Sequence, residues 1–189
     1  MLGNISSIIS ILLIGLVIKT MDDAIDDDSD ISRRFFPYII LLFTGALLLN
    51  FNLAISLFLA SYAVGMFFEP FTILPTGLPS WVETILALIA SILLTSITQT
   101  IWAVLIIFSI QLLDDIIDVT EDEQRGFRNV ANKIGISECI LLFLLFTFCA
   151  TKSLPILSVV SLVSSLIISE IIFPKIKREE VFDGGFKHD

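Results

Sequence analysis

Long apolar segments occupy most of this chain and constrain its fold more than any other feature. A helix that crosses a bilayer needs about 20 mainly apolar residues, and it satisfies its backbone hydrogen bonds internally. Seven apolar runs, separated by charged residues, asparagines or prolines, meet or approach this length. They cover residues 5–25, 35–49, 53–68, 81–96, 101–119, 137–150 and 154–173. We therefore predict an all-α membrane protein, a bundle of about seven transmembrane helices.

Composition excludes a water-soluble alternative. The 189 residues are 56% hydrophobic and 16% charged, with a mean hydropathy of +0.94, so a soluble domain would lack polar side chains to cover its core. We expect one transmembrane domain over residues 1–189. The first apolar run has no basic start and leads into an acidic cluster, so we predict a retained helix rather than a signal peptide. Cys139 and Cys149 lie in one apolar run and suggest no disulfide framework.

The acidic residues are concentrated in two places. The net charge is −9, and twelve of the twenty acidic residues lie in residues 22–30 and 114–123, which we call the first and second acidic windows. A chain this acidic offers no basic stripe for phosphates along a duplex, so we expect no nucleic-acid partner. These windows are the places in the chain where chemistry is most expected.

The basic residues predict the orientation in the membrane. With seven helices, both acidic windows and the C-terminal tail over 175–189 reach the same side. Ten of the eleven basic residues fall on that side, and only Lys152 falls on the other. Lysine and arginine mark the cytoplasmic side of multi-pass proteins. We therefore predict that both windows face the cytoplasm and that the N-terminus lies outside.

An internal repeat relates the two windows. Both follow the pattern DDxxDxxxDxxR, from Asp22 to Arg33 and from Asp114 to Arg125, with each residue displaced by 92 positions. The copies are four predicted helices apart, an even number, so both copies point in the same direction. The repeat predicts two parallel halves, about 1–96 and 97–174.

Helical geometry groups the matched residues on one face. If each copy formed one continuous helix at about 100° per residue, the matched side chains would lie within about 60° of the third aspartate. The first copy contributes Asp22, Asp23, Asp26, Asp30 and Arg33, joined by Lys19, and the second contributes Asp114, Asp115, Asp118, Asp122 and Arg125. Asp27 and Asp28 fall outside this arc, and we expect them to be solvated.

Carboxylates gathered at a helix C-terminus need a cation. They repel one another and meet the negative end of the helix dipole. Oxygen ligands offered from two helices suit Mg²⁺, which keeps several waters and shares its coordination with phosphates. We expect the metal ligands to be Asp22, Asp23, Asp26, Asp30, Asp114, Asp115, Asp118 and Asp122. Flanking cations complete an anion clamp for a diphosphate, and this set is Lys19, Arg33, Arg34, Arg125 and Arg128.

At these residues the chain resembles the UbiA superfamily of intramembrane prenyltransferases. The family's first motif is NDxxDxxxD, and its second is an Asp-rich helix end followed by a pattern like DxxxGxxTLAxxLG. The second copy here continues through Gly126, Asn129 and Gly135, so the resemblance covers residues 114–135 well and 19–34 moderately. Asp22 stands where the family usually has asparagine, and Asn129 stands where it usually has threonine.

The resemblance also implies a fold. Family members usually have nine helices, with the motifs on the second and sixth. The windows here follow the first and fifth predicted helices, so the chain looks like the family fold without its first and last helices. A second copy of the chain, forming a homo-oligomer, is one way to close the cavity that this shorter set leaves open.

The implied activity is a Mg²⁺-dependent reaction of a prenyl diphosphate within the bilayer. The resemblance implies catalytic roles for Asp22, Asp23, Asp26, Asp115 and Asp118, with the metals and basic residues stabilising the diphosphate as a leaving group. An apolar cavity would keep water from the allylic cation. Our first hypothesis is a prenyltransferase that uses a lipophilic acceptor.

Two alternatives remain open. The second hypothesis is a terpene cyclase of the same superfamily, in which the substrate's own tail attacks the cation. Asp22 gives the first window the DDxxD form of diphosphate-ionising terpene enzymes, and the small helix set leaves less wall for an acceptor pocket. The third hypothesis is a non-enzymatic membrane protein that binds divalent cations or lipid, although ion-pathway carboxylates would be expected at mid-membrane.

Overall fold

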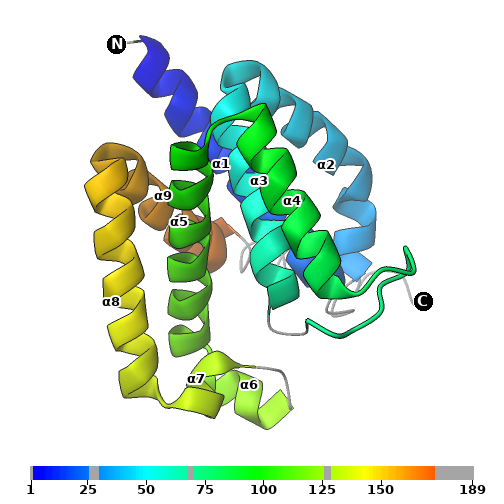
Figure 1. The fold of residues 1–189 in the computed structure, drawn as a ribbon, viewed down its shortest axis with the longest axis vertical. Helices are drawn as coiled ribbons and strands as arrows, with labels where there is room; N and C mark the ends of the chain where they lie inside the picture. Colours follow the sequence, from blue (N-terminus) through cyan, green and yellow to red (C-terminus); the bar gives the residue numbers. More distant parts are fainter. Residues whose placement is uncertain (1, 26–29, 68–69, 126–128, 173–189) are drawn as a thin grey trace, which may run out of the picture. The chain divides into compact units, whose positions relative to one another are not determined.

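The computed structural model describes residues 2–25, 30–67, 70–125 and 129–172 (Figure 1). Within these ranges every regular element is helical, and the only β-type pairing is an isolated bridge between Ile73 and Pro79. The elements in chain order are α1 (Leu2–Ile25), α2 (Asp30–Leu49), α3 (Phe51–Phe67), α4 (Ser80–Leu94), α5 (Ile97–Ile117), α6 (Val119–Arg125), α7 (Val130–Ile134), α8 (Ile136–Ser153), α9 (Pro155–Ile167) and the π-helix η1 (Ile168–Ile172).

Four helical segments are long and apolar enough to cross a membrane. They are Ile5–Asp22, Ile97–Ile117, Ile136–Ser153 and Pro155–Ile172. Three further apolar helices, Pro37–Leu49, Phe51–Phe67 and Ser80–Leu94, are shorter. The sequence predicted seven spans, and the described residues give four by length and composition. Within the described residues, each of the seven apolar runs nevertheless overlaps a helix over most of its length.

Apolar side chains remain exposed along these helices. Leu48 is 84% exposed and Leu93 is 80% exposed, and many other large apolar residues share this position on helix surfaces. A soluble monomer rarely exposes apolar surface on this scale. With the four long apolar helices, this surface indicates a membrane protein.

The chain divides into two compact units. One combines Met1–Ala54 with Val160–Asp189, and the other is Ile55–Val159. These units are defined by contacts, whereas the two halves 1–96 and 97–174 were predicted from the repeated sequence pattern. The division into repeat halves therefore stays a prediction.

In the first unit, α1 packs along α2. Ile11, Ile14 and Val17 are buried on α1, at the spacing of one helix face. Ser10 Oγ donates a hydrogen bond of 2.9 Å to the Ala46 carbonyl across this contact. Such hydroxyl contacts are typical of helix packing in membranes, where apolar burial alone does not favour association between helices.

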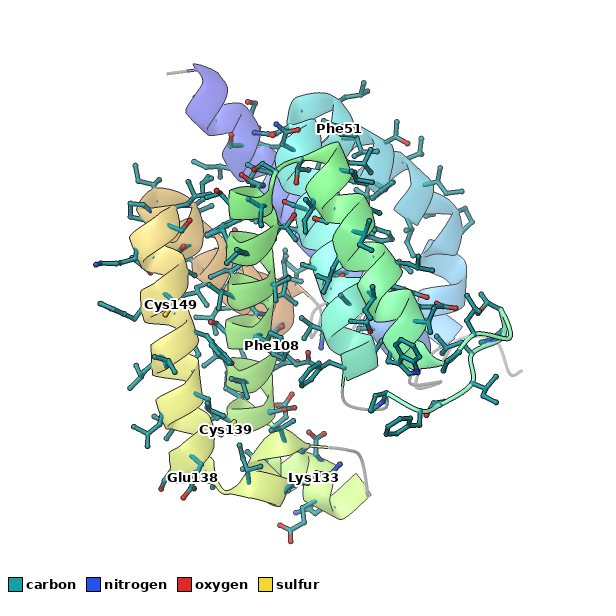
Figure 2. The ribbon with its side chains drawn as sticks, in the orientation of Figure 1. Phe51, Phe108, Lys133, Glu138, Cys139 and Cys149 are labelled. Atoms are coloured by element: carbon teal, nitrogen blue, oxygen red, sulfur yellow. The ribbon has the colours of Figure 1, made fainter. Side chains whose placement is uncertain are left out.

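In the second unit, α5 packs along α8, and Figure 1 shows the short α6 and α7 joining the two. Trp102 on α5 is fully buried, and its Nε1 donates to Ser158 Oγ at 2.9 Å. Ser91 on α4 and Thr100 on α5 share a buried hydrogen bond of 2.8 Å. Both cysteines on α8 are free, with Cys139 buried and Cys149 exposed (Figure 2).

A short loop joins α3 to α4. The Leu74 amide donates to the Leu78 carbonyl at 2.9 Å and the Gly77 amide donates to the Leu74 carbonyl at 2.8 Å, which closes a tight turn with Pro75 at its second position. Gly77 has φ of 83°, a conformation that residues with a Cβ rarely adopt. Proline and glycine therefore set the turn that reverses the chain between the two helices.

Candidate functional site

The second acidic window lies where α5 ends. Asp114 and Asp115 are in the last turn of α5, Asp118 follows it as the C-cap, and Asp122 lies on α6. The C-cap has φ of −93° and ψ of 10°, outside regular helix. The assumption of one continuous helix through this window was therefore wrong, because Asp122 and Arg125 belong to a separate helix.

Asn129 explains why α5 ends there. Its Nδ2 donates a hydrogen bond of 2.7 Å to the Asp115 carbonyl. In a continuing α-helix that carbonyl would accept from the amide four residues later. A buried side chain from beyond α6, only 2% exposed, takes this position instead.

The side-chain amide of Asn129 makes two more contacts. Nδ2 also donates to Asp122 Oδ2 at 2.8 Å, and Oδ1 accepts from the Asn132 amide at 3.1 Å. The second contact makes Asn129 the N-cap of α7. Asn132 Nδ2 in turn donates to the Val119 carbonyl at 3.2 Å. One asparagine thus joins the end of α5, the carboxylate on α6 and the start of α7.

The Asp115 carboxylate is also hydrogen-bonded by the start of α7. Its Oδ2 accepts from the Val130 amide at 3.1 Å, in the first turn of α7. Leu112, one turn before Asp115 on α5, and Ala131, next to Val130, form a small buried apolar core with Cys139. A charged group is costly beside such a core unless it is hydrogen-bonded. The contacts to Asn129 and Val130 therefore fix the orientation of Asp115 and Asp122.

Aromatic side chains lie farther along the same helix. Phe108 on α5 precedes Asp115 by two helical turns, about 10 Å along the axis, and falls close to the same face. The ring centroid of Phe108, which Figure 2 labels, is 5.5 Å from that of Phe67 on α3 and 5.5 Å from that of Phe146 on α8. Within this unit, the carboxylates at the end of α5 are therefore followed, farther along the helix, by aromatic rings that pack around Phe108.

The first acidic window includes residues that the structure does not describe. α1 is described to Ile25 and α2 from Asp30, and residues 26–29 lie outside the described residues, so the continuous helix assumed for this window stays a prediction. Asp22 is exposed near the end of α1, and Lys19 is half-buried one turn earlier. Asp23 lies on α1 and Asp30, Arg33 and Arg34 lie on α2, but the structure describes none of these side chains.

The remaining predicted residues are described only in part. Asp26, Asp27, Asp28 and Arg128 lie outside the described residues, and Arg125 is described only as part of the α6 backbone. The two windows also belong to different units. Their roles as ligands or clamps stay predictions.

The second window has the donor chemistry that Mg²⁺ needs. Among the side chains that the structure describes, no three of His, Cys, Asp or Glu are gathered as a metal-binding group. Mg²⁺, however, is usually held by one or two carboxylates together with waters and substrate phosphates. Asp114 and Asp118, one turn apart and half-buried, supply oxygen donors of this kind. Their chemistry is compatible with Mg²⁺ that also binds a phosphate, and a metal ion at these residues stays a prediction.

Two features escaped prediction from sequence. The first is the bracing role of Asn129, for which the one local signal is an Asn placed before a short helix. The second is a cluster around Glu83 on α4, whose carboxylate is buried and accepts hydrogen bonds from the hydroxyls of Tyr62 and Thr76. The cluster ties the loop before α4 to α3.

Comparisons with known proteins found no matching family model, no matching curated protein and no matching solved structure.

Proposed function

We propose that this protein is a UbiA-like, Mg²⁺-dependent membrane enzyme that ionises a prenyl diphosphate and transfers the prenyl group to a lipophilic acceptor. The observation that carries the proposal is the second acidic window. There, half-buried carboxylates end an apolar helix long enough to cross a membrane, and the buried side-chain amide of Asn129 holds the Asp115 backbone carbonyl and the Asp122 carboxylate. Polar groups of this kind beside a bilayer are usually functional.

The carboxylate end of this site suits the diphosphate. Bound Mg²⁺ would neutralise the developing charge of the leaving diphosphate. Asp114 and Asp118 would hold the ion, while the Asn129 and Val130 contacts keep Asp115 and Asp122 oriented. Arg125 and Arg128, close in sequence, would add charged hydrogen bonds to the phosphate oxygens.

The aromatic end suits the isoprenoid. Phe67, Phe108 and Phe146 present apolar rings deeper along the helix, where they would pack against the tail. Their π faces would stabilise an allylic cation, and their apolar surface would help to keep water away from it. The order of carboxylates and then aromatic rings along α5 matches the order of diphosphate and then tail in the substrate.

The first acidic window enters the proposal by its sequence alone. It repeats the pattern of the second window, and its basic residues Lys19, Arg33 and Arg34 match a phosphate partner in chemistry. We propose that Asp22, Asp23, Asp26 and Asp30 bind Mg²⁺ and a phosphate group by the same chemistry.

The alternative function is a terpene cyclase that uses no acceptor. The DDxxD form of residues 22–26 favours it. Both functions require ionisation of the same diphosphate, so they differ only in what attacks the cation.

The experiment is an activity assay with purified protein in detergent. Geranyl, farnesyl and geranylgeranyl diphosphates are supplied with Mg²⁺, first alone and then with lipophilic acceptors such as quinone precursors. We expect release of diphosphate that needs an acceptor and yields a prenylated product. A hydrocarbon or alcohol formed without acceptor would establish the cyclase. No consumption of any prenyl diphosphate in either condition would contradict both, and would leave a non-enzymatic binder.

A further inference from the structure

Asn129 has two roles, and each depends on a different atom of its side-chain amide. Its Oδ1 accepts from the Asn132 amide and so caps α7. Its Nδ2 donates to the Asp115 carbonyl and to Asp122 Oδ2, and so acts on the acidic window. The cap needs only an acceptor, which aspartate, serine and threonine also supply. The contacts to the window need two donor hydrogens.

We propose that Asn129 is a positioning residue, whose Nδ2 holds the end of α5 and the Asp122 carboxylate in the orientation that binds Mg²⁺ and a diphosphate. The inference rests on the proposed function, and it adds a role for a residue that touches neither metal nor substrate. Residues that orient metal-binding carboxylates typically change metal affinity about 10- to 100-fold when they are replaced.

The geometry favours asparagine over other capping residues. Asn129 is buried, so each hydrogen on Nδ2 needs an acceptor, and both have one within 2.8 Å. A serine or threonine hydroxyl carries a single hydrogen and could serve only one of these acceptors. Loss of the contact to the Asp115 carbonyl would also let α5 continue past Ile117, because that carbonyl would again be open to the amide of Val119.

The test uses two substitutions at this position. Asn129→Asp keeps the cap acceptor, removes both donors and places a second carboxylate beside Asp122. Asn129→Ser keeps the cap, adds no charge and retains one donor, so it serves if Asn129→Asp does not fold. The matched control is Asn132→Ala, which removes an amide that contacts the Val119 carbonyl rather than a carboxylate.

The readout is binding of Mn²⁺, measured by electron paramagnetic resonance in the presence of unreactive farnesyl thiodiphosphate. Thermal unfolding followed by circular dichroism shows whether each variant is folded. We expect folded Asn129→Asp and Asn129→Ser to bind Mn²⁺ about 10- to 100-fold more weakly, with Asn132→Ala close to wild type.

The outcomes separate this inference from the proposed function. Wild-type affinity in both Asn129 variants would overturn the positioning role and leave the proposed function intact. An equal loss in Asn132→Ala would also overturn it, since the loss would then follow from the local fold. If the wild-type protein itself binds no Mn²⁺ with the analogue, the proposed metal site fails, and the positioning role fails with it.

Discussion

Two asparagines end or begin helices in the same manner. Asn50 Oδ1 accepts from the Leu53 amide at 3.2 Å at the start of α3, and its Nδ2 donates to Ser7 Oγ on α1 at 3.0 Å. Asn129 likewise uses Oδ1 to cap α7 and Nδ2 to reach α5 and α6. In both cases one amide joins a local helix start to a distant helix. These hydrogen bonds give a structural reason for the presence of asparagine at these two helix starts.

Asn50→Ala tests this double role. We expect the free energy of unfolding to fall by about 1 to 2 kcal/mol, because the cap and the contact to α1 are lost together. Asn52→Ala is the control, since Asn52 is exposed in the first turn of the same helix. Unfolding curves in detergent give both values. Equal stability of the two variants would show that the Asn50 contacts contribute nothing measurable.

Asp118→Asn tests the candidate metal ligands. It removes one charge with little change in shape, and we expect Mg²⁺-dependent binding of farnesyl thiodiphosphate to weaken about tenfold or more. Glu123→Gln removes the same charge from an exposed position on α6 that the repeat does not match, and should bind like wild type. Calorimetric titration of both variants measures the difference. Equal weakening would mean that overall charge, rather than a defined ligand, governs binding.

At the level of elements, helix locations were predictable and some helix ends were not. Apolar runs predicted every long helix because burial in lipid requires such runs, and Asn50 and the prolines of residues 70–79 mark breaks locally. The end of α5 at Ile117 depends on Asn129, which is 14 residues from Asp115. The spacing of residues within one helix, about 3.6 per turn, gives no sign of a contact between residues so far apart in the sequence. The angular grouping of Asp122 and Arg125 with the earlier aspartates failed for this reason. The aspartates and arginines that suggested the chemistry are visible in the sequence itself.

The contact between α1 and η1 depends on a glycine. A Cβ on Gly15 would lie 2.7 Å from Ile168 Cδ1, whereas a Cβ on Gly65 of α3 would have no atom within 4 Å. We expect Gly15→Leu to lower the free energy of unfolding by about 1 to 3 kcal/mol, because the larger side chain must displace η1. Gly65→Leu should have little effect. Thermal unfolding of the two variants compares them, and a stable Gly15→Leu protein would contradict the close packing.

At the scale of the whole molecule, the apolar surface indicates that the protein lies in a membrane, and the distribution of basic residues predicts its orientation there. Four helices are long enough to cross it, and their exposed faces carry large apolar residues. The basic residues predict which side is cytoplasmic. The predicted orientation would place both acidic windows where a water-soluble cation can reach them.

Labelling of single cysteines tests the orientation. In a background of Cys139→Ala and Cys149→Ala, we expect Lys133→Cys to react with a membrane-impermeant maleimide only after cells are opened. Lys152→Cys, at the exposed end of α8, should react in intact cells. The opposite pattern would invert the topology, and labelling of both from outside would place them on one side.

The central claim is that this protein binds a prenyl diphosphate through a divalent cation, and the most direct measurement is the affinity for unreactive farnesyl thiodiphosphate with and without metal. Carboxylates and diphosphate repel one another, so binding at this site requires the cation. We predict that EDTA weakens binding about tenfold or more and that added Mg²⁺ restores it. Undiminished affinity in EDTA would contradict the account.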